Sequence, residues 1–106
     1  KWIVGAYFFQ SKAGYDGGPL DVVALCSTFS PQELILLQSL GLSLDGPTKV
    51  NPSGGALAGN PIMAVGLVRI AEAAARIIDG SANRALAHAT SGPLLQQTLV
   101  CLLEGE

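Results

Sequence analysis

Four side chains of this 106-residue chain have types suited to acyl or proton transfer, namely Cys26, Asn60, His88 and Thr90. A cysteine thiolate is a nucleophile, and a histidine can accept a proton near neutral pH. His88 and Thr90 lie two residues apart in an apolar run, so a strand there would place both side chains on one face. Asn60 precedes a proline at the expected start of a helix, where its amide could cap the helix, donate a hydrogen bond to an oxyanion, or do both.

The candidates with reactive side chains also have structural interpretations. Cys26 ends an apolar run, and a buried cysteine commonly acts as a small core residue. Cys101 lies inside another apolar run and is predicted to belong to the core. A lone histidine such as His88 is often a hydrogen-bonded structural residue. The two cysteines are far apart and lack metal-ligand spacing, so no metal site is predicted.

A segment rich in glycine, proline, asparagine and serine occupies residues 46–61, near the middle of the chain. It includes Gly54, Gly55 and Gly59 just before a predicted helix. Such a loop could bind a phosphate group at the helix N-terminus. However, no clear strand precedes it, and its spacing does not match the dinucleotide-binding pattern. A tight connection without a ligand is a further interpretation.

Apolar runs and turn signals predict a layered α/β domain with a mixed sheet packed against helices. The predicted strands are residues 1–9, 20–26, 84–90 and 95–104, and the predicted helices are residues 30–40 and 61–79. A helix is the alternative for residues 95–104. Residues 10–19 form a predicted loop, so residues 1–19 are an N-terminal strand and loop, and residues 20–106 are the main domain. The last two strands should form a hairpin around the turn Ser91-Gly92-Pro93.

The first predicted helix has signals at both of its ends. Ser30 is a good N-cap, Pro31 suits the first helical position, and Glu33 completes the pattern of a capping box. Gly41 is the predicted stop, because glycine readily adopts the left-handed conformation that ends many helices. The helix should therefore cover residues 30–40 and follow the buried strand at 20–26.

The second predicted helix is bounded by Asn60 and Gly80. Its charged residues Arg69, Glu72 and Arg76 lie three or four positions apart and share one polar stripe. Its other faces consist of isoleucine, valine, leucine and alanine. We therefore expect this helix to be deeply packed.

The composition indicates a chain that is covered in part by other protein. Charged residues make up 13 % of the sequence and hydrophobic residues 49 %, whereas an ordinary soluble domain has about 25 % charged residues. A small domain has a large surface for its volume and should need more charge, so we expect a homo- or hetero-oligomer. The net charge of −2 gives no indication of nucleic-acid binding. No apolar run is long enough for a membrane span, no signal peptide is recognisable, and a cytoplasmic location is expected.

Three sequence motifs occur in the order and approximate spacing found in thiolases. The segment Val50–Pro61 resembles their glycine-rich loop, in which Asn-x-x-Gly-Gly is followed by Gly-His-Pro and a helix. The segment Leu20–Ser30 resembles the strand that ends in Asn-Glu-Ala-Phe, with Phe29 at the final position. The segment Leu86–Gly92 resembles the strand that ends in Cys-x-Gly. The likeness covers residues 20–104 and is strongest to lipid-transfer or sterol-carrier-type thiolases and acetyl-CoA acetyltransferase-like proteins.

The resemblance implies a protein of two similar βαβαβαββ halves, each with a five-stranded sheet. This chain would supply most of the second, C-terminal half, and a thiolase-like N-terminal half or partner subunit would supply the first. Thiolases form or cleave a carbon–carbon bond beside a thioester, so acyl-CoA is the implied substrate, and no cofactor is implied.

The motif positions differ from the thiolase pattern in three places. Asn60 stands at the Gly-His-Pro histidine, Cys26 at the first residue of Asn-Glu-Ala-Phe, and Thr90 at the Cys-x-Gly cysteine. Asparagine can donate to an oxyanion but cannot move protons, and threonine has no usable base at neutral pH. The acyl-accepting cysteine of the first half is not in this chain. The resemblance assigns substrate-binding roles to Gly54, Gly55, Gly59, Ser91 and Gly92.

Three functions are compatible with these patterns. The first is the C-terminal part of a thiolase-like acyl-CoA acyltransferase, or of a related retro-aldolase that needs no acyl-accepting cysteine. The second is a degenerate, non-catalytic module that binds acyl-CoA or completes the fold of a partner. The third is a free-standing α/β interaction domain, which predicts a stable folded monomer.

Overall fold

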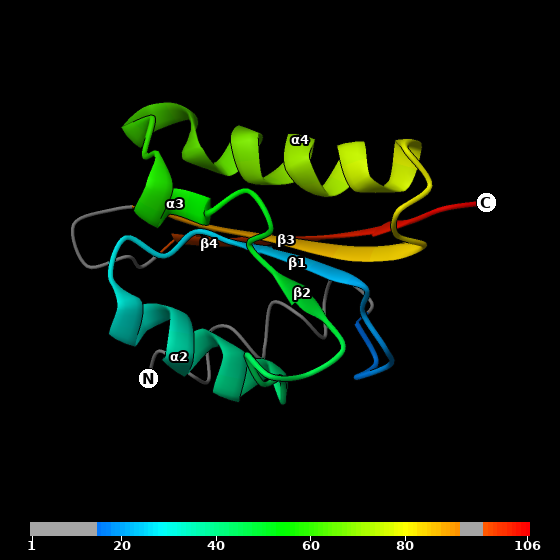
Figure 1. Cartoon of the computed structure of the whole chain (residues 1–106). Coiled ribbons are helices and arrows are strands. Elements are labelled where there is room, and N and C mark those ends of the chain that lie inside the picture. The colour runs from blue at the N-terminus through cyan, green and yellow to red at the C-terminus, as the bar shows by residue number, and fades with distance from the viewer. Residues whose placement is uncertain (1–14, 92–96) are drawn as a thin grey trace.

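The computed structural model describes residues 15–91 and 97–106 (Figure 1). The predicted strand at 1–9 and the first part of the predicted loop, residues 10–14, lie outside the described residues. In chain order, the elements are β1 (Val22–Leu25), α2 (Ser30–Leu40), β2 (Lys49–Val50), α3 (Gly55–Ala58), the 3₁₀ helix η1 (Ile62–Ala64), α4 (Val65–Ile78), β3 (Arg84–Ser91) and β4 (Gln97–Glu104).

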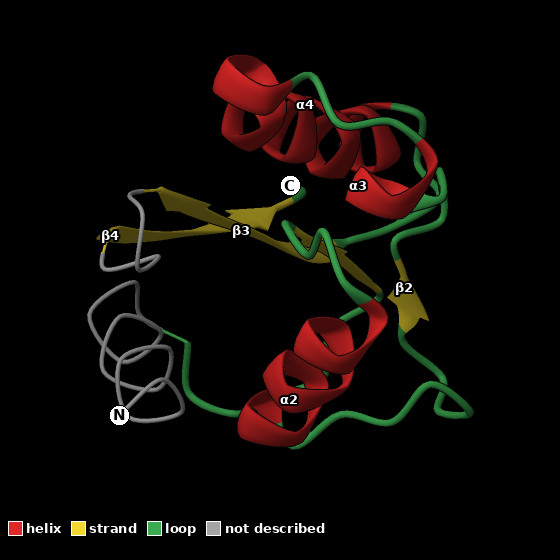
Figure 2. Ribbon diagram, turned by 90° about the vertical axis from the view of Figure 1, so that its left-hand side faces the viewer, coloured by secondary structure: helices red, strands yellow, loops and turns green. Residues whose placement is uncertain are grey.

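The four strands form one mixed sheet in the order β2-β1-β3-β4. β1 pairs in parallel with both β2 and β3, and β3 pairs antiparallel with β4 over its full length. α3 and α4 lie over one face of the sheet and α2 lies under the other (Figures 1 and 2). The predicted layered α/β fold and the antiparallel pairing of the last two strands are therefore confirmed for the described residues, whereas Ser91 belongs to β3 and the other two residues of the predicted turn lie outside the described residues.

The central strands β1 and β3 are buried on both faces of the sheet, because their alternate side chains enter two different cores. On the α2 side the core consists of Leu20, Val23, Leu25, Leu37, Leu40 and Leu86. On the α4 side it consists of Val22, Ala24, Ala73, Ala82, Ala85 and Ala87. The second core is made mostly of alanines, which lets α4 lie close to the sheet. A Cβ at Gly66 would stand only 3.0 Å from Cβ of Ala89, so the first turn of α4 nearly touches β3.

α2 has the predicted length, but its first turn is stabilised differently. Gly41 ends the helix with φ +70°, as expected for a left-handed cap. The predicted Ser30 cap is wrong, because Ser30 is already helical and Phe29 occupies the N-cap position without a side-chain hydrogen bond. The Thr28 N–H donates instead to the side chain of Gln32 at 3.3 Å. Glu33 is therefore available for a different contact.

That contact is a polar network at the carboxyl end of β1. Glu33 Oε2 accepts hydrogen bonds from Ser27 Oγ and from Asn51 Nδ2, both at 2.9 Å. Asn51 Oδ1 accepts the Leu25 N–H at 2.7 Å. Asn51 holds φ +43°, a conformation that asparagine tolerates better than most residues. The network joins β1, the start of α2 and the loop after β2.

The segment at 46–61 contains more regular structure than predicted. The two-residue β2 pairs with β1, and α3 follows it within a few residues. The expectation that no strand precedes the glycine-rich loop is therefore wrong. Two paired residues carry no readable periodicity, which explains the error. Gly54 and Gly55 have φ values of +90° and +61°, and a Cβ at Gly55 would lie 2.8 Å from Asn51 Cγ.

The second predicted helix is divided at its start. Ile62 has φ +44°, which is unusual for a β-branched residue and separates the short η1 from the preceding chain. α4 then continues to Ile78, and Gly80 follows in the left-handed conformation. The predicted polar stripe is partly internal, because Arg69 is 2 % exposed and pairs with Glu72 at 3.1 Å. α4 buries one side against the sheet and leaves the other side exposed, so the expected deep packing is only half right.

Replacement of Asn51 by alanine should lower the free energy of unfolding by about 2–4 kcal/mol. The buried Leu25 N–H would lose its acceptor, and alanine at positive φ would add strain. Urea denaturation of the variant measures the loss. Asn83→Ala, which replaces an exposed asparagine, is the control and should change the free energy of unfolding by no more than about 0.5 kcal/mol. Equal stability of the two variants would contradict the role assigned to Asn51.

Candidate functional site

The candidate site lies where β1 and β3 end, at the edge of the sheet nearest η1. Ligands of open α/β sheets commonly bind outside the carboxyl ends of parallel strands, because the loops diverge there. Two adjoining hollows occupy this edge, and they share Ile62, Val65 and Thr90 as lining residues. We call the larger one the apolar groove and the smaller one the polar pocket.

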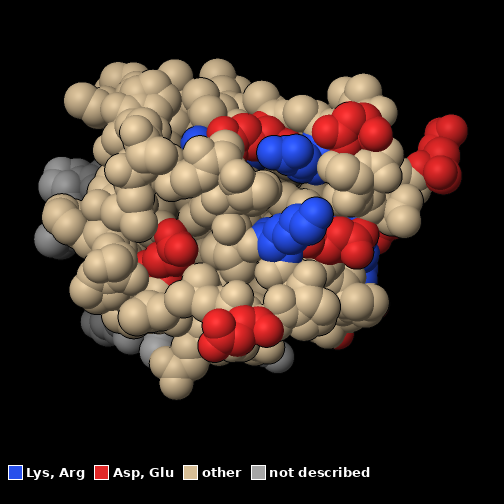
Figure 3. All heavy atoms as spheres, viewed as in Figure 1, with Lys and Arg blue, Asp and Glu red and all other residues tan. Residues whose placement is uncertain are grey.

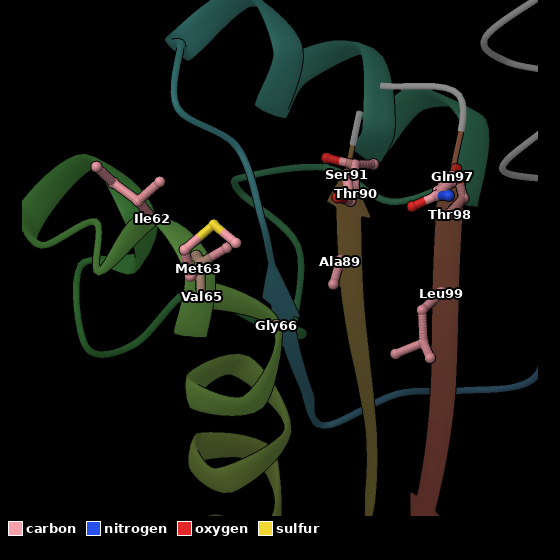
Figure 4. A pocket seen from close by; sticks show the side chains of 10 residues that line it. All are labelled: Ile62, Met63, Val65, Gly66, Ala89, Thr90, Ser91, Gln97, Thr98 and Leu99. Carbon is pink, nitrogen blue, oxygen red and sulfur yellow. The ribbon is translucent and has the colours of Figure 1, made fainter. Parts of the chain in front are cut away.

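The apolar groove has a volume of about 300 Å³. Figure 4 shows that it runs between the start of α4 and the β3–β4 hairpin, with Ala89 and Leu99 directed toward the helix side. Gly66 of α4 lines the groove and has no side chain that would fill it. The lining residues are Ile62, Met63, Val65, Gly66, Ala89, Thr90, Ser91, Gln97, Thr98 and Leu99.

The polar pocket has a volume of about 120 Å³ and opens beside the groove. Its lining residues are Cys26, Thr28, Gln32, Asn60, Ile62, Val65 and Thr90. Cys26 arrives from β1, Thr28 and Gln32 from the start of α2, Asn60 from the loop before η1, and Thr90 from β3. Three of the four predicted catalytic residues therefore line one pocket, although they are far apart in the sequence.

Asn60 is not a helix N-cap, because Pro61 holds that position for η1 and Ala64 for α4, but its side chain stabilises the turn before η1 and keeps a donor group. Its Oδ1 accepts the Ile62 N–H at 3.1 Å, which stabilises the turn into η1. Because a backbone N–H can only donate, this contact identifies the oxygen of the amide. Nδ2 has no hydrogen-bond partner among the described residues, so it can donate a hydrogen bond to a ligand in the pocket. The predicted helix cap is therefore wrong in position, and the role of oxyanion donor stays a prediction.

Cys26 is mostly a core residue with one side toward the pocket. It is 4 % exposed, and it packs with Ala56, Val65 and Ala89 on the α4 side of the sheet. Its backbone N–H donates to the His88 carbonyl at 3.0 Å, which continues the pairing of β1 with β3. Its thiol forms no disulfide with the other cysteine, Cys101. The packing agrees with the structural interpretation of Cys26.

His88 does not line either hollow, although it shares a strand face with Thr90. In the sheet its neighbours are Leu25 on β1 and Val100 on β4, and it is 3 % exposed. Burial lowers the pKa of His88 to about 4, so the imidazole is neutral at pH 7. Cys26 projects from the opposite face of the sheet, together with Ala89. This arrangement keeps His88 from acting as a base for Cys26.

The predicted substrate-binding residues divide into three groups. Ser91 lines the apolar groove. Gly54, Gly55 and Gly59 line neither hollow, and the first two serve the backbone of α3, where side chains would collide. Gly59 is extended, with φ −161°, and has no close neighbour at the Cβ position. Gly92 lies outside the described residues.

Several lining residues were not identified from the sequence. Thr28 and Gln32 bring a hydroxyl and an amide to the polar pocket, and Leu99 and Met63 line the groove. Gln32 stands in the first turn of a helix, where a polar residue is unremarkable in a sequence. Leu99 is 50 % exposed within an otherwise apolar strand, so its exposure has no sequence signal. The strained φ of Ile62, which lies between the two hollows, also depends on the folded chain.

Both hollows of the site combine neutral polar groups with apolar side chains, and Thr90, Ser91, Gln97 and Thr98 bring hydroxyl and amide groups to the apolar groove as well. Among the described residues that line it, none carries a carboxylate, an ammonium, a guanidinium or an imidazole group. Hydroxyl and amide groups can hold a carbonyl oxygen by hydrogen bonds, and the apolar groove can bury a hydrocarbon chain. The arrangement is suited to binding a neutral acyl group, and it offers no general base of its own.

Two further properties concern the part of the chain that the structure describes. It contains no group of three or more histidine, cysteine, aspartate or glutamate side chains arranged to hold a metal ion. None of its helices has the length and apolar character needed to cross a membrane.

Acidification from pH 7 to pH 5 should lower the free energy of unfolding by roughly 2 kcal/mol through His88. Its folded pKa, about 4, lies below the 6.5 of a free histidine, so the unfolded chain binds the proton first. This stability is complete above pH 6.5 and disappears as the pH falls toward 4. The pKa values of Asp16, Asp21 and Asp79 are lowered from 3.8 by hydrogen bonds, so their contributions are lost at lower pH.

Denaturant titrations at pH 7 and pH 5 test this assignment, with His88→Leu as the comparison. The variant should lose most of the pH dependence between these two values because leucine does not titrate. If the free energy of unfolding of the variant falls between pH 7 and pH 5 as much as that of the unmodified chain, another group is responsible for the pH dependence.

We found no matching protein-family model, no similar curated protein and no similar solved structure for this chain.

Proposed function

We propose that this chain is the C-terminal part of a thiolase-like protein and that its site binds the acyl-thioester end of an acyl-CoA. One observation carries the proposal. Cys26, Asn60 and Thr90 are the three positions that the thiolase motifs assign to one active centre, and they line one pocket. Cys26 and Thr90 are brought together by the parallel pairing of β1 with β3, and the added support is that Asn60, from the loop before η1, reaches the same pocket.

The adjoining groove supports an acyl ligand. A thioester carbonyl in the polar pocket would be within reach of the Asn60 amide and the Thr90 hydroxyl, while its hydrocarbon chain would lie along Val65, Ala89 and Leu99. Burial of apolar surface contributes about 25 cal/mol per Å², so even a short chain gains affinity in such a groove.

The same geometry favours binding over turnover by this chain alone. Acyl transfer needs a nucleophile with an adjacent base, and none of the described lining residues is a base that could activate the Cys26 thiol or the hydroxyl groups of the site. We therefore propose the non-catalytic, acyl-CoA-binding function for the isolated chain.

Catalysis by a complete assembly is the second candidate, and the donor group of Asn60 favours it. The Asn60 Oδ1 accepts the Ile62 N–H, whereas its Nδ2 has no partner among the described residues and could donate to an enolate or a tetrahedral oxyanion. A thiolase-like N-terminal half would then bring the acyl-accepting cysteine and the base. The assembly would act as an acyltransferase or, without the acyl-accepting cysteine, as a retro-aldolase.

Calorimetric titration should show that the chain binds octanoyl-CoA at least tenfold more tightly than free coenzyme A. Leu99→Asp should remove most of this preference, because a carboxylate in the groove opposes a hydrocarbon chain. Leu44→Asp is a matched control, since Leu44 is similarly exposed and lies outside the two hollows. Equal affinities for octanoyl-CoA and coenzyme A would refute the acyl site.

Asn60→Ala should weaken octanoyl-CoA binding by about three- to tenfold, the usual effect of one lost hydrogen bond. Asn83→Ala, which alters an exposed asparagine elsewhere, should leave the affinity unchanged. A turnover assay with the same samples tests the non-catalytic function proposed for the isolated chain. Thiolysis or acyl transfer by the chain alone would contradict the non-catalytic proposal.

A further inference from the structure

The two edges of the sheet differ in length and in charge. β2 forms one edge with only two residues, and one of them is the exposed Lys49. In Figure 3, which has the viewpoint of Figure 1 with β2 in front, basic and acidic side chains lie together on this side of the molecule. Short edge strands and edge lysines keep a sheet from pairing with another chain. The β2 edge is therefore protected.

β4 forms the opposite edge of the sheet (Figure 2) and has none of these protections. Its eight residues pair one to one with β3, so the strand is regular and has no bulge. It contains no proline, glycine, lysine or arginine, and its one charged residue, Glu104, stands at its end. Among the described residues β3 is its only partner strand. A long, regular, apolar edge of this kind is suited to pairing with a further strand.

The direction of the backbone groups shows what this edge can bind. The Gly105 N–H donates to the Asn83 carbonyl at 2.7 Å, so these two residues form a hydrogen-bonded pair. Such pairs alternate along an antiparallel ladder, so the odd-numbered residues of β4 bond to β3. The residues that direct their N–H and C=O groups away from β3 are Thr98, Val100, Leu102 and Glu104. Another extended strand satisfies such a row of alternating donors and acceptors.

One antiparallel register lets a second copy of β4 pair with all of these outward residues. It places Thr98 opposite Glu104 and Val100 opposite Leu102, and the two-fold axis passes between the two copies of Cys101. The next register in either direction that keeps the outward residues paired would leave Thr98 or Glu104 without a partner in β4. The direction of the backbone groups therefore selects a single self-pairing.

The apolar side chains that meet in this register match on both faces of the sheet. Leu99 lies opposite Leu103 on the α4 face, where Leu103 and Cys101 pack at the rim of the alanine-rich core. Val100 and Leu102 lie opposite each other on the α2 face, at the rim of the leucine-rich core. All five side chains are partly or half exposed in the single chain. Pairing with a second copy covers each of them with an apolar neighbour.

The polar residues of β4 also fit a second copy. Glu104 lies opposite the hydroxyl of Thr98 in this register, so no like charges meet. Its carboxylate is already paired with the Arg84 guanidinium at 2.9 Å. A strand of another protein would have to meet both the apolar pattern and this end charge, whereas a second copy meets them by symmetry.

We propose that β4 is an interface between two copies of this chain, whose β4 strands pair antiparallel across a two-fold axis. The sheets of the two copies then join into one continuous sheet. Leu103 of the second copy lies beside Leu99, so each copy adds apolar surface next to the groove of the other. The interface rests on the strand edge and does not depend on the proposed acyl-CoA function.

Sedimentation equilibrium of the full chain tests the proposal. The expected particle has twice the chain mass of 10.9 kDa at tens of micromolar protein. Cys101→Lys should raise the dissociation constant at least tenfold, because two ammonium groups would lie opposite each other at the axis. Cys101→Ser should leave the dimer intact. Leu44→Lys is the matched control, since Leu44 is 54 % exposed and lies outside β4.

The position of Cys101 at the axis gives a second test, which keeps the apolar strand unchanged. Opposite residues of a non-hydrogen-bonded pair have Cα atoms about 4.5 Å apart, within the roughly 4.4–6.8 Å that a disulfide spans. Oxidised glutathione should therefore join two Cys26→Ala chains through Cys101, the two thiols being oxidised and the glutathione disulfide reduced to two thiols. A chain whose only cysteine is at Leu99→Cys should not cross-link, because position 99 faces Leu103.

A monomer at several hundred micromolar would overturn the proposal. If that monomer protects the Val100 and Leu102 amides from hydrogen exchange, the chain covers its own edge. A dimer that Cys101→Lys leaves unchanged, or that does not cross-link through Cys101, would place the interface elsewhere and overturn the proposal as well. Octanoyl-CoA titration of the same samples keeps the two proposals apart. A monomer that binds it overturns the interface alone, and a dimer that does not bind it overturns the acyl site alone.

Discussion

The geometry of the site depends on how the polar network at Asn51 ends β1. A strand that continued past Leu25 would pair further with β2 and close the edge of the sheet. Instead, Asn51 Oδ1 takes the Leu25 N–H, and its Nδ2 binds the Glu33 carboxylate. The chain of β2 then turns away into α3. Cys26 and Ser27 are left at the open end of the strand, and the polar pocket forms beside them.

The opposite wall of the site depends on close contact between α4 and β3. Gly66 and Ala89 permit this contact, and the alanine-rich core behind them maintains it. η1 begins at a strained residue, Ile62, and the side chain of Asn60, just before it, accepts the Ile62 N–H and lines the pocket. The resulting site has hydrogen-bonding groups without charge. Such an environment holds a carbonyl group well, but it leaves proton transfer to groups from outside the described chain.

The sequence predicted the main helices and the longer strands because they have strong signals. β1 is a short, fully buried apolar run, α2 has a glycine stop, and β3 and β4 are long apolar strands that pair antiparallel. It did not predict β2 or α3, because two and four residues are too few to show a period. The predicted capping box at the start of α2 is wrong, because a glutamate at this position can equally accept a hydrogen bond from the side chain of Asn51.

Of the candidate site, the sequence predicted the residues better than their surroundings. Cys26, Asn60 and Thr90 were identified by motif position, and the fold brings them to one pocket. His88 was grouped with Thr90 because they share a strand face, but two residues along β3 are enough to move a side chain from an open edge into the core. The groove residues Met63 and Leu99 have no distinguishing signal, because an exposed apolar residue in a sequence is indistinguishable from a buried one.

The most direct test of the acyl site is a titration of the ¹⁵N-labelled chain with octanoyl-CoA, followed by amide chemical shifts. The account predicts shifts that saturate at Asn60, Thr90 and Leu99, with small changes at Lys49 and Asp79, which lie away from the two hollows. Shifts confined to the opposite edge of the sheet, or no saturable shifts at millimolar ligand, would contradict the assignment of the pocket and groove as the acyl-thioester site.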